Sequence, residues 1–309
     1  MKHNQVRQIV FPLLTALIWG TSFVAQDVCS EKMGAMTFNA VRSYIAVIAL
    51  LLIIFIFGKL KKDKPQLTTE QKKQGRKQLW IGGFCCGTAL AVGANLQQAG
   101  LGAGTDAGKA GFITALYIVL VPIFGLFFKK KVSLPVWISV ALAVIALYLL
   151  CVNGALTIAY GDLLMLLCAA FFAIHILVID HFTQFVDGMK LSCIQFLVAG
   201  TWSFIGMLVF EQPDWSAVLS CALPILYVGI FSSGVAYTLQ ILAQKDSDPT
   251  VVSLLLSLES VFATLAGAVI LHDQMSLKEY FGCLLMLAAV ILAQLPEPKS
   301  GRKKAVSSN

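Results

Sequence analysis

Three charged side chains stand out among those in the long apolar stretches of this sequence. Glu259 is near the middle of the stretch 249–271, and Lys109 and Arg42 are closer to the ends of two others. A charge at the centre of a bilayer costs about 2.5–3.5 kcal/mol on insertion scales, so such residues are expected to be paired or functional. Glu259 could hold a proton, bind a cationic group of a substrate, neutralise Lys109 or Arg42, or lock two helices together. Lys109 and Arg42 could attract a carboxylate, or extend their long stems to water.

A second group of polar and aromatic side chains is predicted to lie at a similar depth. Polar groups in a membrane must find partners or line a wet cavity. Each residue by itself is typical of an interhelical hydrogen bond, but together they indicate a central polar pathway. The predicted substrate-binding residues besides the three charges are Trp19, Ser22, Asn95, Gln97, Thr114, Tyr117, Tyr237, Gln240 and Ser257.

Enzyme chemistry has little support in this sequence. It contains no Gly-rich phosphate loop, no HExxH and no GxSxG motif. Most of the eight cysteines lie inside apolar stretches without a CxxC or a Cys/His cluster, so we interpret them as small buried hydrophobes. We expect no metal and no cofactor. His175 and Asp180 are left out of the site, since a lone membrane histidine is more often a helix contact.

The elements that would position these residues are membrane helices. The 309 residues are 58% hydrophobic and 13% charged, whereas soluble domains are about 25% charged. Apolar stretches of about 20 residues, the length that spans a bilayer as a helix, recur along the chain. The sequence therefore predicts an all-α integral membrane protein with ten transmembrane helices. The expected spans are 9–27, 36–58, 79–101, 107–128, 134–153, 161–181, 191–210, 221–243, 249–271 and 277–295.

The loop charges predict the orientation of these helices. With the N-terminus inside, the cytoplasmic segments collect most Lys and Arg residues, including those of Lys59–Lys77 and Lys129–Lys131. The opposite side carries only Lys32, Lys109 and Lys278. Positive loops stay in the cytoplasm, so both termini are expected there, in a multi-pass protein of the inner (plasma) membrane. Orientation also explains the net charge of +7, so no nucleic-acid partner is implied.

The two halves of the chain align as a repeat. Residues 87–150 match 230–293 at a fixed offset of 143, and the first two helices of each half align at an offset of 153. The positive Lys129–Lys131 then falls on His272–Gln274. A repeat that keeps its helices and loses its positive loops should be inverted, which is a common architecture of secondary transporters.

The repeat divides the chain into three parts. We expect a first five-helix unit at 1–153, an inverted second unit at 154–295 and a basic cytoplasmic tail at 296–309. Gln97 and Gln240 are related by this five-plus-five repeat and could form matching outer and inner gates.

Three stretches carry a family resemblance. They are Ala16-Leu-Ile-Trp-Gly-Thr-Ser-Phe-Val-Ala25, Ala107-Gly-Lys-Ala-Gly-Phe-Ile-Thr-Ala-Leu116 and Leu258-Glu-Ser-Val-Phe262. In order and spacing they resemble EamA-type members of the drug/metabolite transporter superfamily. The resemblance implies ten helices, cytoplasmic termini and a substrate chamber between the halves, and many relatives export amino acids or other small metabolites. Trp19, Lys109 and Glu259 fall in the signature segments.

The sequence departs from the family pattern at two places. Relatives often have proline after the helix-nine glutamate, where this chain has Ser260, and they often end that helix in Gly-Glu, where this chain has His272-Asp273. These departures weaken the transfer of a mechanism that needs a proline break beside Glu259.

The residues and the resemblance together favour a secondary transporter that exports a small metabolite, an amino acid or related compound, by alternating access. Efflux of lipophilic cations is the main alternative, because Glu259 with aromatic side chains also suits a cation. A non-transporting scaffold or receptor and a membrane-bound enzyme are alternatives from other classes. The expected partners are a small-molecule substrate, membrane lipid and a proton as coupling ion, with a homodimer as a further possibility.

Overall fold

The computed structural model describes most of the chain. The described residues are 2–60, 68–105, 107–130, 132–152, 158–245, 247–266 and 275–295. The predictions about Lys131, His272–Gln274 and the tail 296–309 lie outside the described residues.

The described residues form helices and no strand. Seven passes are single helices: α1 (Lys2–Ser30), α2 (Ala35–Leu60), α3 (Thr69–Gly102), α6 (Leu134–Cys151), α7 (Tyr160–Phe182), α8 (Gly188–Phe210) and α14 (Leu277–Ala293). Three passes are interrupted: α4 (Ala107–Ala115) with α5 (Tyr117–Phe127), α10 (Ala222–Tyr227) with the π-helix η1 (Val228–Ala236) and α11 (Tyr237–Gln244), and α12 (Pro249–Leu256) with α13 (Glu259–Ala266). A short helix, α9 (Trp215–Ser220), precedes α10.

The described helices include eight that are long and apolar enough to cross a membrane. The other two passes are shorter, namely the apolar segment Pro249–Leu265 and the 17-residue α14. The predicted all-helical membrane fold is therefore confirmed.

Several helices begin at capping residues. Thr68 forms a reciprocal capping box with Gln71, so α3 begins inside the segment that was predicted to be a basic loop. Asp248 accepts hydrogen bonds from Thr250 N and Val251 N, with Pro249 at the first helical position of α12. These side chains satisfy backbone N–H groups that the first turn of a helix leaves free.

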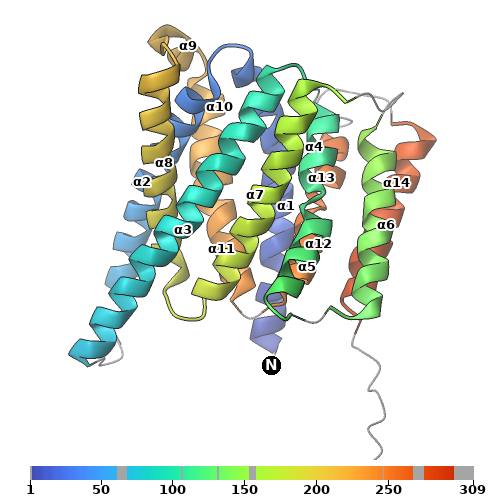
Figure 1. Ribbon diagram of the computed structural model, residues 1–309, viewed down its shortest axis with the longest axis horizontal. Coiled ribbons are helices and arrows are strands. Elements are labelled where there is room, and N and C mark those ends of the chain that lie inside the picture. The colour runs from blue at the N-terminus through green and yellow to red at the C-terminus, as the bar shows by residue number, and fades with distance from the viewer. Residues whose placement is uncertain are drawn as a thin grey trace, which may run out of the picture.

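The helix contacts have the symmetry of a repeat. Helices α2 and α8 pack together at one side of the bundle, and α6 and α14 pack together at the other (Figure 1). Between these two pairs, the contact of α3 with α7 corresponds to the contact of α1 with α11. The contact of α3 with α8 corresponds to the contact of α2 with η1. The contact of α7 with α4 and α5 likewise matches that of α1 with α12 and α13. Exchanging the two halves therefore preserves these main helix contacts.

Two passes that were predicted to be continuous are broken near the bundle centre. The first breaks at Leu116, between α4 and α5, and the second at Ser257–Leu258, between α12 and α13. These positions correspond within two residues at the 143-residue offset. Pro122 lies inside α5 and does not cause the first break.

The second break forms without a proline. Leu258 N and Ser260 N donate to carbonyls three residues back, at 3.3 and 3.2 Å, so the α-helical pattern is interrupted there. The Ser257 hydroxyl also donates to Leu254 O at 2.8 Å. Such serine bonds compete with the backbone and bend helices. The missing proline therefore does not remove the break beside Glu259.

Candidate functional site

A small cavity lies between the two halves. Its volume is about 40 Å³. Nine of the twelve predicted site residues line it: Trp19, Ser22, Arg42, Gln97, Thr114, Tyr117, Tyr237, Gln240 and Glu259. Gln97 and Gln240 were predicted to form separate outer and inner gates, but both line this one cavity.

Glu259 lines the cavity directly after the second helix break. It is the first residue of α13, and its side chain is only 4% exposed. The hydroxyl of Tyr117, the first residue of α5, donates to Glu259 Oε1 at 3.4 Å. The broken passes of the two halves therefore meet at this carboxyl group.

Arg42 faces the same cavity from α2 and is 5% exposed. Its Nη1 donates to Gln26 Oε1 at 3.1 Å, and its guanidinium carbon lies 5.3 Å from the centroid of the Phe38 ring. Its Nε is buried and has no hydrogen-bond partner among the described residues. The ion pairs found among the described side chains do not join Arg42 to Glu259. One cavity thus holds a guanidinium and a carboxyl group that do not pair with each other.

Aromatic rings form part of the cavity wall. The centroids of Trp19 and Tyr237 are 4.6 Å apart, and Trp19 Nε1 donates to Ser232 O at 3.4 Å. Ser232 belongs to the π-helix η1, and π-helical turns occur frequently at functional sites. This wall suits a cationic or apolar group of a solute.

Several lining residues were not predicted from the sequence, and His175 is one of them. Its side chain is 1% exposed, and His175 Nε2 lies 3.0 Å from Gln195 Oε1. The repeat could have indicated His175 as a site residue, because position 175 aligns with Ser22 at the 153-residue offset. The lining residues that were missed are Phe23, Gln26, Phe172, His175, Ile176 and Ser232.

Lys109 is the first of three predicted site residues that do not line the cavity. Its Nζ forms an ion pair with Asp162 Oδ2 at 2.5 Å, so it links α4 to α7. Thr105 also donates to this carboxylate, at 3.3 Å. Lys109 is therefore engaged by a carboxylate of α7 and does not face a solute in the cavity.

Asn95 and Ser257 also have other neighbours. Asn95 Nδ2 donates to Ser203 Oγ on α8 at 2.8 Å and to Ala91 O at the same distance. The Ser257 hydroxyl is directed to Leu254 O and lies 3.5 Å from Met286 Sδ on α14. Both residues hold helices in place, because their polar atoms are used in contacts away from the cavity.

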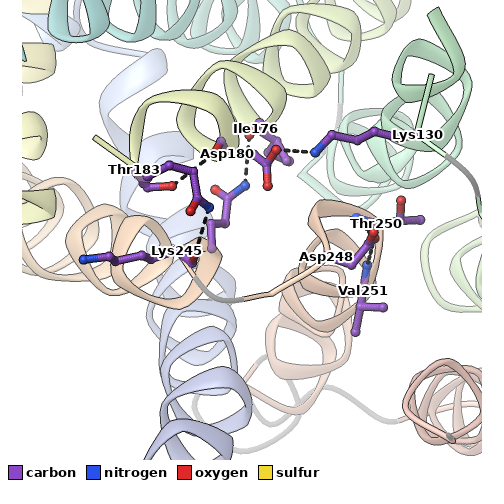
Figure 2. A network of polar contacts seen from close by, with 10 residues as sticks. Lys130, Ile176, Asp180, Thr183, Lys245, Asp248, Thr250 and Val251 are labelled. Atoms are coloured by element: carbon purple, nitrogen blue, oxygen red, sulfur yellow. Dashed lines mark hydrogen bonds and ion pairs between the residues drawn. The ribbon is translucent and has the colours of Figure 1, made fainter. Parts of the chain in front are cut away.

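Polar contacts tie the helices together at the end of the bundle where α1 begins, called here the N-terminal end. Lys130, just beyond α5, pairs with Asp180 of α7 (Figure 2). Gln184 Nε2 donates to Lys245 O, and Gln244 Nε2 donates to Ile176 O, each at 2.9 Å. With Lys109 and Asp162 at the opposite end, α7 is held to its neighbours at both ends.

The described residues contain no group of three or more His, Cys, Asp and Glu side chains that could hold a metal ion. The cavity is lined by groups that can bind a solute, namely one cation, one carboxyl group, amides and aromatic rings.

Comparisons with known proteins agree with a transport role. The profile of the EamA-like transporter family matches residues 7–152 and again 159–295. A protein of Archaeoglobus fulgidus named "Uncharacterized transporter" is 32% identical over 91% of this chain and 84% of its own length. A WAT1-related protein of Arabidopsis thaliana is 32% identical over 44% of this chain and 35% of its own. A solved crystal structure has the same fold, with a TM-score of 0.75 at 16% identity, covering 93% of this chain and 96% of that one.

The helical membrane fold and the two family matches define a multi-pass membrane transporter. The chain belongs to the EamA-like transporter family, within the drug/metabolite transporter superfamily.

Proposed function

We propose that this transporter exports a small zwitterionic metabolite, an amino acid or a related compound. The observation that carries the proposal is the placement of Arg42 and Glu259 on one cavity without an ion pair between them. Arg42 comes from the first half of the chain and Glu259 from the second. A zwitterion would therefore contact both halves at once.

Each group of an amino acid has a counterpart in the wall. The Nε donor of Arg42 lacks a partner in the described part of the chain, and guanidinium groups bind carboxylates strongly. Glu259 suits the ammonium group. Gln240 Oε1 is also buried, has no partner among the residues that the structure describes, and can accept a hydrogen bond from an N–H group. Trp19 and Tyr237 add ring faces to which a cation is attracted.

Burial favours a zwitterion over a lipophilic cation. Taking charges out of water is costly unless each finds a partner. A zwitterion brings a partner for Arg42 and a partner for Glu259, whereas a lipophilic cation satisfies only Glu259. The lipophilic cation remains the alternative because of the aromatic wall.

The small size of the cavity supports an alternating-access mechanism. Ligand pockets usually measure about 300–1,000 Å³, far more than the central cavity. The two halves, 1–153 and 154–295, would therefore separate at one end and then at the other. The contacts of Lys109 with Asp162 and of Lys130 with Asp180 are the ones that would open in turn. In the proposed orientation both termini are cytoplasmic, the membrane is the cell's inner membrane, and Glu259 carries the coupling proton.

Measuring amino-acid efflux from proteoliposomes tests this proposal. Purified protein is reconstituted, and the efflux of radiolabelled standard amino acids is measured with and without a pH gradient. Arg42→Gln and Glu259→Gln should each reduce efflux at least tenfold, because a buried charged hydrogen bond contributes about 1.5–3 kcal/mol.

The matched controls are Glu31→Gln and Lys32→Gln, which remove one charge of each sign from exposed positions. They should transport normally. Full efflux by both cavity variants would contradict the proposed site. Transport of lipophilic cations in place of amino acids would support the alternative substrate.

A further inference from the structure

A large apolar groove lies on the bundle between α5 and α7, near the N-terminal end. Its volume is about 780 Å³, and its walls include Phe124, Phe127, Leu177, Val178 and Phe182. The Phe127 side chain is 81% exposed. In a membrane protein such a surface faces hydrocarbon, so lipid chains are the solvent that fills it.

Cations lie at one end of this groove. Lys130 lines it and is 35% exposed, and Lys129 beside it is exposed. The carboxylate of Asp180 is already paired with Lys130. The rim therefore carries a surplus of positive charge next to an apolar channel.

The backbone at this rim is in an unusual conformation. Lys129 has φ 58°, and it is the only residue other than glycine with a positive φ among those described. Lys129 N donates to Leu126 O at 2.9 Å, and Lys130 N donates to Gly125 O at 3.1 Å. This is a Schellman end of α5, in which glycine usually occupies the position of Lys129. A left-handed lysine is energetically unfavourable, and strained residues tend to cluster at functional sites.

We infer that this groove binds an anionic phospholipid. One acyl chain lies along the aromatic and aliphatic walls, and the phosphate is held by Lys129 and Lys130. The cation surplus selects an anionic headgroup, whereas a lipophilic cation would meet Lys129 and Lys130 at the same rim. Basic pockets between membrane helices are suited to anionic headgroups.

The lipid contacts both halves of the protein, because α5 belongs to the first and α7 to the second. Its phosphate competes with Asp180 for Lys130. The inference is independent of the proposed substrate, since it uses none of the residues that line the central cavity.

Native mass spectrometry of the purified, delipidated full chain tests the site. Phosphatidylglycerol and phosphatidylcholine with identical acyl chains are added in equal amounts, and the bound lipid is counted. Wild-type protein should retain phosphatidylglycerol several-fold more than phosphatidylcholine. The double variant Lys129→Gly/Lys130→Gln should lose this preference.

Two control variants separate a specific loss of lipid binding from a general loss of charge or of folding. Lys72→Gln/Lys73→Gln, on the exposed first turns of α3, removes the same charge away from the groove and should keep the preference. Lys129→Gly alone relieves the strained backbone, so it should raise the melting temperature while it weakens lipid binding, and misfolding cannot then explain the loss.

A groove-filling variant tests the chain contact. Val178→Trp should reduce the binding of both lipids. Equal retention of the two lipids by wild type would overturn the inference, as would an equal loss of preference in the Lys72/Lys73 control. Displacement of phosphatidylglycerol by equimolar inorganic phosphate would also overturn it, because the acyl chain would then contribute nothing.

Discussion

Gly20 of α1 packs directly against the second helix break, and the substitution Gly20→Ala should disturb that contact. A Cβ at this position would lie 2.6 Å from Glu259 O, 2.9 Å from Ala263 N and 2.9 Å from Phe262 Cβ. Two of these atoms are backbone atoms, so no side-chain rotation relieves the clash. Helix α1 and the α12–α13 segment must move apart.

The size of the effect follows from these distances. Ordinary contact begins at 3.4 Å, so the nearest approach is short by about 0.8 Å. Overpacking of this kind costs about 1–3 kcal/mol, which for a chain of this length lowers the melting temperature by about 2–5 °C. Glu259 moves with α13, so its position relative to Arg42 in the cavity changes. A loss of about 1.4 kcal/mol in substrate binding weakens the affinity tenfold.

Thermal unfolding in detergent and amino-acid efflux from proteoliposomes measure both consequences. Gly111→Ala is the matched control, since its Cβ would have no atom of the described neighbours within 4 Å and alanine stabilises a helix by roughly 0.5–1 kcal/mol over glycine. If Gly20→Ala melted and transported like wild type, the close contact between α1 and the break at Glu259 would be refuted.

Three further predictions concern single polar contacts. Asp162→Asn should lower the free energy of unfolding by about 2 kcal/mol, because Lys109 loses its carboxylate; a thermal melt unchanged from wild type would contradict this. Glu211→Gln should lower it by about 1 kcal/mol, because Glu211 accepts bonds from the first backbone N–H groups of α2 and from the Thr37 hydroxyl. His175→Asn should raise the substrate KM with little change in melting temperature, and an unchanged KM would place His175 outside the substrate path.

Much of the fold could be predicted because it depends on properties of long sequence segments and not on single residues. Apolar stretches and loop charge depend on composition averaged over many residues, and the repeat depends on register. The helix breaks have a local cause that is harder to detect. Ser257 and Leu258 carry no proline or glycine signal, and the break depends on a serine hydroxyl bond and on packing against α1.

The site could be predicted only in part, because depth in the membrane does not determine which face of a helix a residue occupies. Lys109 and Asn95 lie at plausible depths but meet Asp162 and Ser203 on neighbouring helices. His175 is a single histidine in an apolar helix, which by itself indicates a helix contact, but it is the repeat mate of Ser22, a predicted site residue. Using the repeat to transfer positions between the halves would have recovered it.

The central claim is that Arg42 binds the carboxylate and Glu259 the ammonium group of one solute. The direct test measures efflux of the best-transported amino acid, its methyl ester and its N-acetyl derivative by wild type, Arg42→Gln and Glu259→Gln. Wild type should discriminate against both derivatives. Arg42→Gln should lose discrimination against the ester, and Glu259→Gln against the N-acetyl compound. Unchanged discrimination in both variants would contradict the assignment of either residue.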